Sequence, residues 1–176
     1  IVQASGLDWT IVRPPWVYGP GDADTLDMFR MARNGFVLLP PDGRISVIEV
    51  SDLARLLLAL VPAGETRAQH YEADDGKDGG WSHRSFGKAI GWAVGRNVTA
   101  ISVPGFALRL AARMDRLFRG TKAKLTVDRV GYFCHPDWTV DPARQPPPAL
   151  WLPQMGTREG LKATAAAYRE AGWLKP

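Results

Sequence analysis

The sequence contains no long apolar run and almost no cysteine. Its longest uninterrupted apolar stretch, residues 56–61, lies between Arg55 and Pro62, far short of the roughly 20 apolar residues that span a bilayer. Cys134 is the one cysteine, which excludes a disulfide within the chain and favours a reducing compartment. We therefore expect a cytoplasmic protein.

Residue patterns for several kinds of site are also missing. The histidines His70, His83 and His135 are far apart and form no i, i+4 pair, so we expect no metal site. A Gly-x-Ser-x-Gly elbow is absent, which removes the basis for a hydrolase. The net charge is +4, with one local basic cluster from Arg109 to Lys124. Because no basic run is interleaved with stacking aromatic residues, we expect no nucleic-acid partner.

Strand and helix patterns alternate along the chain of 176 residues. β-branched and aromatic segments predict strands at residues 9–13, 45–50, 69–73 and 98–103. Apolar periodicity predicts helices at residues 24–33, 51–61, 82–94, 104–118, 125–133 and 157–172. We expect Ser51 or Asp52 to cap the second of these helices. A proline-rich extended arm, residues 141–153, precedes the last helix, and the alternation indicates a mainly parallel α/β fold.

The loop after the first strand is a candidate binding site. Ligands of open α/β sheets bind at the carboxyl ends of strands, and this loop directly follows residues 9–13. Pro14 and Pro15 stiffen it, while Gly19 and Gly21 allow backbone conformations closed to other residues. A rigid turn with no role in binding explains the same residues, so both interpretations stay open.

The same loop carries a family resemblance. Its sequence, TIVRPPWVYGPGD at residues 10–22, resembles the strand and loop of the extended short-chain dehydrogenases/reductases, the NAD(P)-dependent epimerase/dehydratase family. Three later segments resemble that family in the same order: ISVIEVSDLARLLLAL, LTVDRVGYFCHPDWTVD and EGLKATAAAYREAGWL. The resemblance implies the C-terminal part of a Rossmann-like doubly wound parallel sheet with a small α/β substrate-binding lobe. It also implies NAD or NADP as the cofactor and a small-molecule substrate with a reacting hydroxyl or carbonyl group.

The family's catalytic residues have no counterpart in this sequence. No Gly-rich dinucleotide fingerprint opens a helix, and none of Tyr18, Tyr71, Tyr132 and Tyr168 has a lysine four residues later. The resemblance therefore implies that residues 1–176 are the substrate-binding portion of a larger enzyme. Its cofactor-binding half, with the Tyr-x-x-x-Lys pair, would lie upstream, and we expect the chain alone to be inactive. The choice between NAD and NADP and the oligomeric state stay open.

The resemblance also implies where ligands bind. In related enzymes the loop after this strand packs against the nicotinamide ring, which gives the cofactor-side candidates Pro14, Pro15, Trp16 and Val17. The substrate-side candidates are Trp16, Tyr18 and Trp81.

Two departures from the family pattern concern the substrate. Relatives that act on nucleotide sugars commonly have Asn at the position of Trp16, and an indole cannot replace the donor and acceptor of an amide. Their diphosphate-binding Arg falls on Ile45 here, and Arg44 is one residue away, on the other face of a strand. We therefore expect a less polar substrate than a nucleotide sugar, such as a sterol-, flavonoid- or quinone-like carbonyl compound.

The helix that follows Pro104 is amphipathic, with a basic stripe of Arg109, Arg113 and Arg116. Such a helix can lie on an anionic membrane surface or meet a partner, but its apolar face also suits packing on a core, which we favour. Two alternatives to an enzyme stay open. One is a non-catalytic family member that serves as a structural or quinone- or lipid-associated subunit, and the other is a membrane-surface module that uses this helix.

Overall fold

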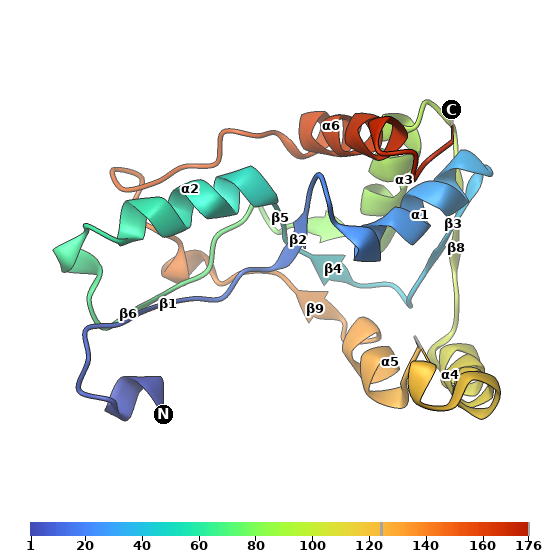
Figure 1. Cartoon of the computed structure of the whole chain (residues 1–176), viewed down its shortest axis with the longest axis horizontal. Helices are drawn as coiled ribbons and strands as arrows, with labels where there is room; N and C mark the ends of the chain where they lie inside the picture. Colours follow the sequence, from blue (N-terminus) through green and yellow to red (C-terminus); the bar gives the residue numbers. More distant parts are fainter. Residues whose placement is uncertain (124, 176) are drawn as a thin grey trace.

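The computed structural model describes residues 1–123 and 125–175. Lys124, the last residue of the basic cluster, and Pro176, the last residue of the predicted domain, therefore lie outside the described residues. After a short 3-10 turn, η1 (Val2–Ala4), strand β1 (Thr10–Val12) pairs in parallel with β6 (Gln69–Tyr71) (Figure 1). This pair confirms the strands predicted at residues 9–13 and 69–73.

Two further parallel pairs follow the same pattern. β2 (Trp16–Tyr18) lies beside β5 (Val47–Glu49), and β3 (Phe36–Leu39) lies beside β8 (Thr99–Ser102). β8 confirms the strand predicted at residues 98–103, whereas β3 is additional to the predicted strands. β2 lies within the segment that was predicted to be a loop, because pairing with β5 makes residues 16–18 a strand. The predicted mainly parallel α/β fold is therefore confirmed.

A three-stranded sheet crosses the middle of the molecule. β4 (Arg44–Ile45) pairs in parallel with β9 (Asp137–Trp138) and in antiparallel with β7 (Trp81–Ser82). The strand predicted at residues 45–50 is thus divided at Ser46 into β4 and β5. The hydroxyl of Ser46 donates to the Asp74 carboxylate at 2.6 Å, so the chain between the two strands is tied to the loop after β6.

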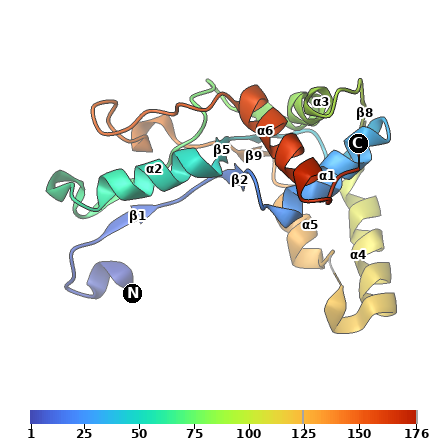
Figure 2. The same ribbon diagram turned by 45° about the horizontal axis from the view of Figure 1, so that its top comes forward.

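Three helices pack together at the end of the molecule that holds the C-terminus (Figure 2). They are α1 (Ala23–Arg33), α3 (His83–Ala93) and α6 (Thr157–Glu170), with α3 in contact with both of the others. Asp22 caps α1 and Ser82 caps α3, each by accepting amide hydrogens of the first turn. All three helices confirm the predicted ones.

The main hydrophobic core lies between these helices and the strands. Its larger buried members are Tyr18, Leu26, Phe29, Val37, Leu39, Ile45, Val47, Phe86, Ile90, Leu161, Tyr168 and Leu174. A smaller core under α2 (Val50–Leu60) contains Ile48, Leu56, Ala73 and Trp151. The two cores meet along the β2–β5 pair, which brings the loop after β1 against both of them.

The helix α2 begins differently from the prediction. Its cap is Glu49, whose carboxylate accepts the Ser51 amide at 2.7 Å, so the prediction that Ser51 or Asp52 caps it is wrong. Asp52 is 2% exposed and its carboxylate accepts hydrogen bonds from elsewhere in the chain. Beyond α2, the 3-10 turn η2 (Gly64–Thr66) leads into β6.

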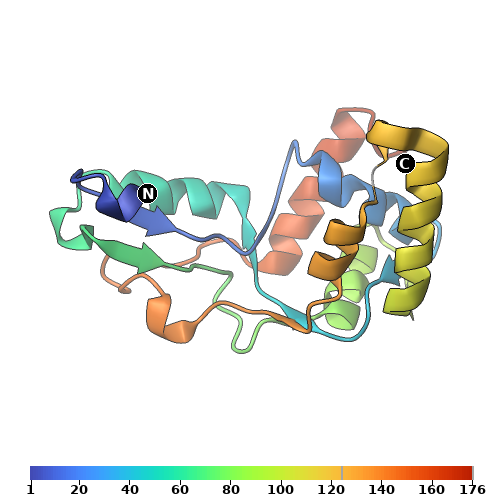
Figure 3. The same ribbon diagram turned by 90° about the horizontal axis from the view of Figure 1, so that it is seen from below.

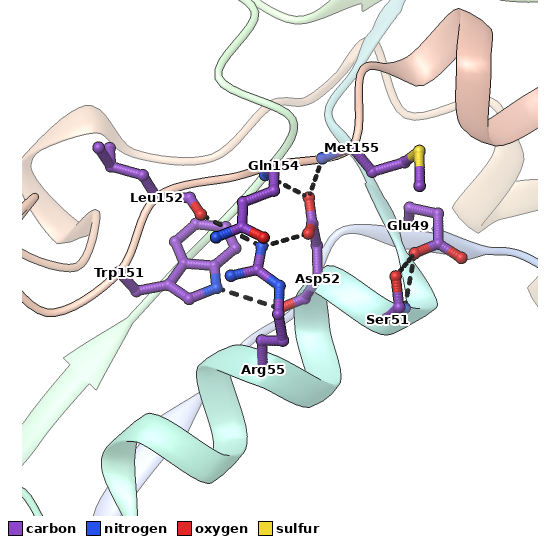
Figure 4. A network of polar contacts seen from close by, with 8 residues as sticks. All are labelled: Glu49, Ser51, Asp52, Arg55, Trp151, Leu152, Gln154 and Met155. Atoms are coloured by element: carbon purple, nitrogen blue, oxygen red, sulfur yellow. Dashed lines mark hydrogen bonds and ion pairs between the residues drawn. The ribbon is translucent and has the colours of Figure 1, made fainter.

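The predicted arm, residues 141–153, is extended except for the 3-10 turn η4 (Pro142–Arg144) and a hydrogen-bonded turn at residues 148–150, and its end is fixed by Asp52 (Figure 4). The Asp52 carboxylate accepts the amides of Gln154 and Met155, each at 3.0 Å, and pairs with Arg55. The Trp151 indole donates to the Asp52 carbonyl oxygen at 3.1 Å. These hydrogen bonds therefore hold the end of the arm against α2, just before α6 begins.

Two helices lie apart from both cores. α4 (Gly105–Arg119), the 3-10 turn η3 (Gly120–Lys122) and α5 (Val127–Phe133) stand at the opposite end from β1 and the N-terminus (Figures 1 and 3). Ala112 is the one buried residue of α4, so the prediction that this helix packs on the core is wrong. In the part of the chain that the structure describes, no helix is long and apolar enough to cross a membrane.

Candidate functional site

The cofactor-side candidates follow directly on the carboxyl end of β1. Pro14 is exposed, and Pro15, Trp16 and Val17 are half-buried. The amide of Arg13 donates to the carbonyl oxygen of Tyr71, the last residue of β6, at 2.9 Å. The loop thus leaves the sheet at the edge where open α/β proteins bind their ligands.

Phe86 brings the three substrate-side candidates together. This residue of α3 is 1% exposed, and the centroid of its ring lies 5.9 Å from that of Trp16, 6.4 Å from Trp81 and 6.5 Å from Tyr18. The sequence alone does not distinguish Phe86 as a site residue, since its position on the apolar face of a helix indicates core packing alone. One local feature could have indicated its role: Phe86 lies four residues after the Ser82 cap. This spacing puts its ring in the first turns of α3, next to Trp81.

Trp16 is held in place from its polar end. Its indole nitrogen donates to the Thr25 hydroxyl oxygen at 3.1 Å, and the Thr25 hydroxyl donates in turn to the Asp22 carboxylate. Thr25 and Asp22 belong to the start of α1 and to its cap. The α1 cap therefore fixes the indole, whose half-buried ring faces Phe86.

Tyr18 has no exposed surface. Its hydroxyl donates to the carbonyl oxygen of Thr157 at 3.4 Å, and burial raises the pKa of this phenol above its ordinary value. Tyr18 thus joins β2 to the start of α6 and packs edge-on against Phe86. A direct contact between Tyr18 and a substrate stays a prediction, and it requires a movement that exposes this ring.

Trp81 is fixed by the loop between β6 and β7. Its indole nitrogen donates to the Asp75 carboxylate at 2.7 Å, and the Thr157 hydroxyl donates to the same oxygen. The Lys77 ammonium lies 4.9 Å from the centroid of the indole ring, a distance typical of a cation–π contact. The indole is half-buried, so part of its ring is available to a ligand.

A buried carboxyl group holds the start of that loop. Asp74 is 3% exposed and accepts hydrogen bonds from the Ser46 hydroxyl at 2.6 Å, the Gly76 backbone amide at 3.0 Å and the Gln145 side-chain amide at 3.4 Å. Burial raises the pKa of the Asp74 carboxyl, against the opposing effect of the Ser46 and Gly76 hydrogen bonds. Asp74 thus joins the β4–β5 connection, the loop after β6 and the arm.

Gly19 lets the loop approach α2 closely. A Cβ atom at this position would collide with the Val50 side chain and lie 2.9 Å from a Glu49 carboxylate oxygen. Because Glu49 caps α2, the glycine allows β2 and the loop to sit directly on the start of this helix. A side chain here would push the loop, and Trp16 with it, away from both cores.

Arg44 and Ile45 point in different directions, as their positions in a strand predict. Ile45 is 5% exposed and belongs to the main core. The Arg44 guanidinium donates to the carbonyl oxygens of Gly79 at 2.6 Å and Gly80 at 3.3 Å. Arg44 therefore holds the loop before β7.

The described residues give no sign of a metal centre. Among them, no three His, Cys, Asp or Glu side chains gather closely enough to hold a metal ion. His83 uses one ring nitrogen in a hydrogen bond of 2.8 Å to the carbonyl oxygen of Pro41, and His70 lies 3.2 Å from the Gln3 side-chain nitrogen. The expectation of no metal stays a prediction.

No protein-family model matches the chain, but solved structures of NAD(P)-dependent epimerases and dehydratases share its fold. The UDP-glucose 4-epimerase of Thermotoga maritima is 21% identical, with a TM-score of 0.62 over 97% of this chain and 48% of its own. The human epimerase family protein SDR39U1, solved with NADPH, is 18% identical, with a TM-score of 0.66 over 89% of this chain and 48% of its own. The chain therefore has the Rossmann-like fold of these enzymes, which confirms the family resemblance at the level of the fold.

A curated relative is more similar in sequence. The ceramide reductase of Caulobacter vibrioides is 30% identical over 186 aligned positions, which cover 98% of this chain and 55% of that protein. The chain thus spans about half the length of the relatives that it matches.

Proposed function

We propose that the protein is an NAD(P)-dependent oxidoreductase that acts on a carbonyl or hydroxyl group of a lipid-like substrate, and that this chain supplies the substrate side of the site. The enzyme class is supported by the fold, which neighbours solved with NADPH or NAD share. The lipid-like substrate is supported by the relative named as a ceramide reductase, because it aligns with 98% of this chain.

The observation that carries the proposal is the aromatic wall, which we define as Trp16, Phe86 and Trp81. The two half-buried indoles pack against one buried phenylalanine, and each indole nitrogen already donates a hydrogen bond to a protein oxygen. The wall therefore offers apolar ring surface to a ligand. Apolar ligands favour such a surface, because binding removes both surfaces from water.

Pro14 and Pro15 suit the cofactor side of the same site. Proline has no backbone amide to leave unpaired, so the exposed Pro14 and half-buried Pro15 present ring and backbone surface against which a planar ring can pack. When NAD(P) is bound, its nicotinamide gives or accepts the hydride. Residues of this chain would hold that ring in place on one side and the substrate on the other.

Arg44 argues against a nucleotide sugar. Its guanidinium donates to two backbone carbonyl oxygens, so two of its five N–H groups are already engaged with the protein and fewer remain for a diphosphate. The nucleotide-sugar enzymes among the solved neighbours are 12% to 21% identical to this chain, a likeness that concerns the fold and not the substrate.

Turnover by the complete protein, which includes the cofactor-binding half expected upstream of this chain, tests the proposal. A long-chain N-acyl amino ketone with NADPH or NADH is compared with UDP-glucose and NAD. We expect oxidation of the reduced cofactor that depends on the ketone, with binding roughly tenfold tighter for each two methylene groups that reach the aromatic wall. Conversion of UDP-glucose would contradict the lipid-like substrate. Binding of the ketone without turnover would favour the non-catalytic subunit instead.

A further inference from the structure

The helix α4 exposes an apolar stripe to solvent along its whole length. Four of its residues are spaced by four positions and a fifth lies beside them, so all five share one side of the helix. They are Phe106, Leu110, Met114, Leu117 and Phe118, with exposed fractions of 73%, 60%, 44%, 75% and 78%. Contiguous exposed apolar surface of this kind marks an interaction site, whereas single exposed residues do not.

A basic stripe runs directly beside the apolar one. Arg109, Arg113 and Arg116 are exposed, and each immediately precedes a member of the apolar stripe in the sequence. The guanidinium groups of these three residues make no ion pair or hydrogen bond with the residues that the structure describes. Their charges are therefore available to an anionic partner.

The one acidic residue of α4 lies on a different side of the helix. Asp115 accepts the Leu125 amide at 2.9 Å and pairs with Arg119 at 3.3 Å. Ala112, on the side away from the apolar stripe, is buried. The outward surface of α4 thus combines apolar and positively charged side chains without a carboxylate.

We infer that α4 docks the protein on the surface of an anionic lipid bilayer, with its axis in the plane of the membrane. A helix of this composition inserts its apolar side at the boundary between headgroups and acyl chains, while its arginines bind lipid phosphates. The phenylalanine and leucine side chains suit the acyl-chain side of that boundary, and the arginine side chains suit the headgroup side. The arginine stripe of α4 is positively charged and the lipid phosphates are negatively charged, so we assign an anionic membrane as the partner of this surface.

The position of α4 leaves this surface open. Figures 1 and 3 show α4 at the edge of the molecule, with α5 on one side and β1, β6 and α2 at the far end. Docking through α4 would bring an enzyme with a lipid-like substrate to the membrane in which that substrate is dissolved. The docking itself does not depend on the proposed reaction, because it uses no residue of the aromatic wall.

Vesicle flotation of the purified protein, without cofactor or substrate, tests the inference. Vesicles of phosphatidylglycerol are compared with vesicles of phosphatidylcholine. One variant removes three charges (Arg109→Ala, Arg113→Ala and Arg116→Ala), and a second breaks the apolar stripe (Leu117→Glu and Phe118→Glu). The control removes three exposed charges elsewhere (Lys88→Ala, Arg96→Ala and Lys162→Ala). All substituted side chains are exposed, so circular dichroism should confirm unchanged folding.

We expect the unaltered protein and the control to float with phosphatidylglycerol, and to float less at high salt. The charge variant should bind on the order of a hundredfold more weakly, and the apolar variant should lose binding to both kinds of vesicle. The inference would be overturned if the unaltered protein did not float, or if the control lost binding as much as the charge variant. It would also be overturned if light scattering gave twice the mass of one chain for the unaltered protein and the mass of a single chain for the apolar variant. The last result would assign the stripe to a second copy of the chain.

Discussion

The guanidinium of Arg44 donates from Nε to the carbonyl oxygen of Gly79 at 2.6 Å. This hydrogen bond ties β4 to the loop that ends at β7, and so to Trp81 in the aromatic wall. The residue closest in sequence to the diphosphate-binding arginine of related enzymes therefore holds protein backbone. Its neighbour Ile45 is in the core.

Replacing Arg44 should loosen that loop. Arg44→Ala removes the hydrogen bonds to Gly79 and Gly80, and we expect it to lower the free energy of unfolding by about 1 kcal/mol. Arg96→Ala is the matched control, because Arg96 is exposed, and should change stability by less than about 0.5 kcal/mol. Urea denaturation measures both. Weaker binding of UDP by Arg44→Ala than by the unaltered protein would show that Arg44 binds diphosphate after all.

Asp52 should be among the most sensitive positions for stability. Asp52→Ala leaves the amides of Gln154 and Met155 without their acceptor and removes the carboxylate that pairs with Arg55, which should cost about 2–4 kcal/mol. Asp52→Asn keeps one acceptor oxygen and should cost less. The control Asp27→Ala breaks an exposed ion pair with Arg30 and should cost at most about 0.5 kcal/mol. Equal effects of Asp52→Ala and Asp27→Ala would refute the role of Asp52 in holding the arm.

Asp74 should make stability depend on pH. Burial raises the pKa of its carboxyl in the folded state, so the folded protein binds this proton more tightly than the unfolded chain does. The resulting stabilisation is complete below the unfolded pKa of roughly 3.9 and is lost as the pH rises through the folded pKa. Asp74→Asn cannot ionise and should remove this decrease in unfolding experiments at a series of pH values.

Asp137 supplies a control of opposite sign for that experiment. Hydrogen bonds from the Thr139 hydroxyl and amide lower the pKa of the exposed Asp137 carboxyl. Its stabilisation is therefore present above the unfolded pKa and is lost as the pH falls through the folded pKa. A profile that Asp74→Asn leaves unchanged would mean that Asp74 does not titrate as proposed.

Trp16 should determine how tightly the substrate binds. Trp16→Asn removes the indole from the aromatic wall, and we expect KM for a long-chain ketone to rise by roughly tenfold to a hundredfold, with a smaller change in kcat. Trp92→Ala is the control, because Trp92 is an exposed indole further along α3. Equal changes in KM for the two variants would remove Trp16 from the substrate site.

Much of the secondary structure could be predicted because its signals are local. Asp22 and Ser82 precede apolar periodic segments, and both cap the helices that follow. The loop after β1 was recognisable because Pro14 and Pro15 end the strand abruptly. By contrast, β7 and β9 contain two residues each, too few to show any alternation.

The rest depends on contacts between distant segments. The carboxylate of Asp52 suits a helix cap, but it binds amides more than 100 residues later, and Glu49 takes its place as the cap. The grouping of three aromatic candidates around Phe86 likewise depends on how α3 packs on β2. The amphipathic pattern of α4 was evident, yet nothing in it revealed which side faces the protein.

Transfer of deuterium from the cofactor to the lipid would show that the enzyme reduces a lipid-like ketone. The complete protein, with the cofactor-binding half expected upstream of this chain, is incubated with NAD(P)H deuterated at C4 of the nicotinamide and with a long-chain N-acyl amino ketone, and the lipid product is analysed by mass spectrometry. We predict one deuterium on the carbinol carbon of the lipid and a product that Trp16→Asn forms more slowly at low ketone concentration. A lipid that stays unreduced and unlabelled, while UDP-glucose is converted under matched conditions with NAD, would refute the lipid-like substrate.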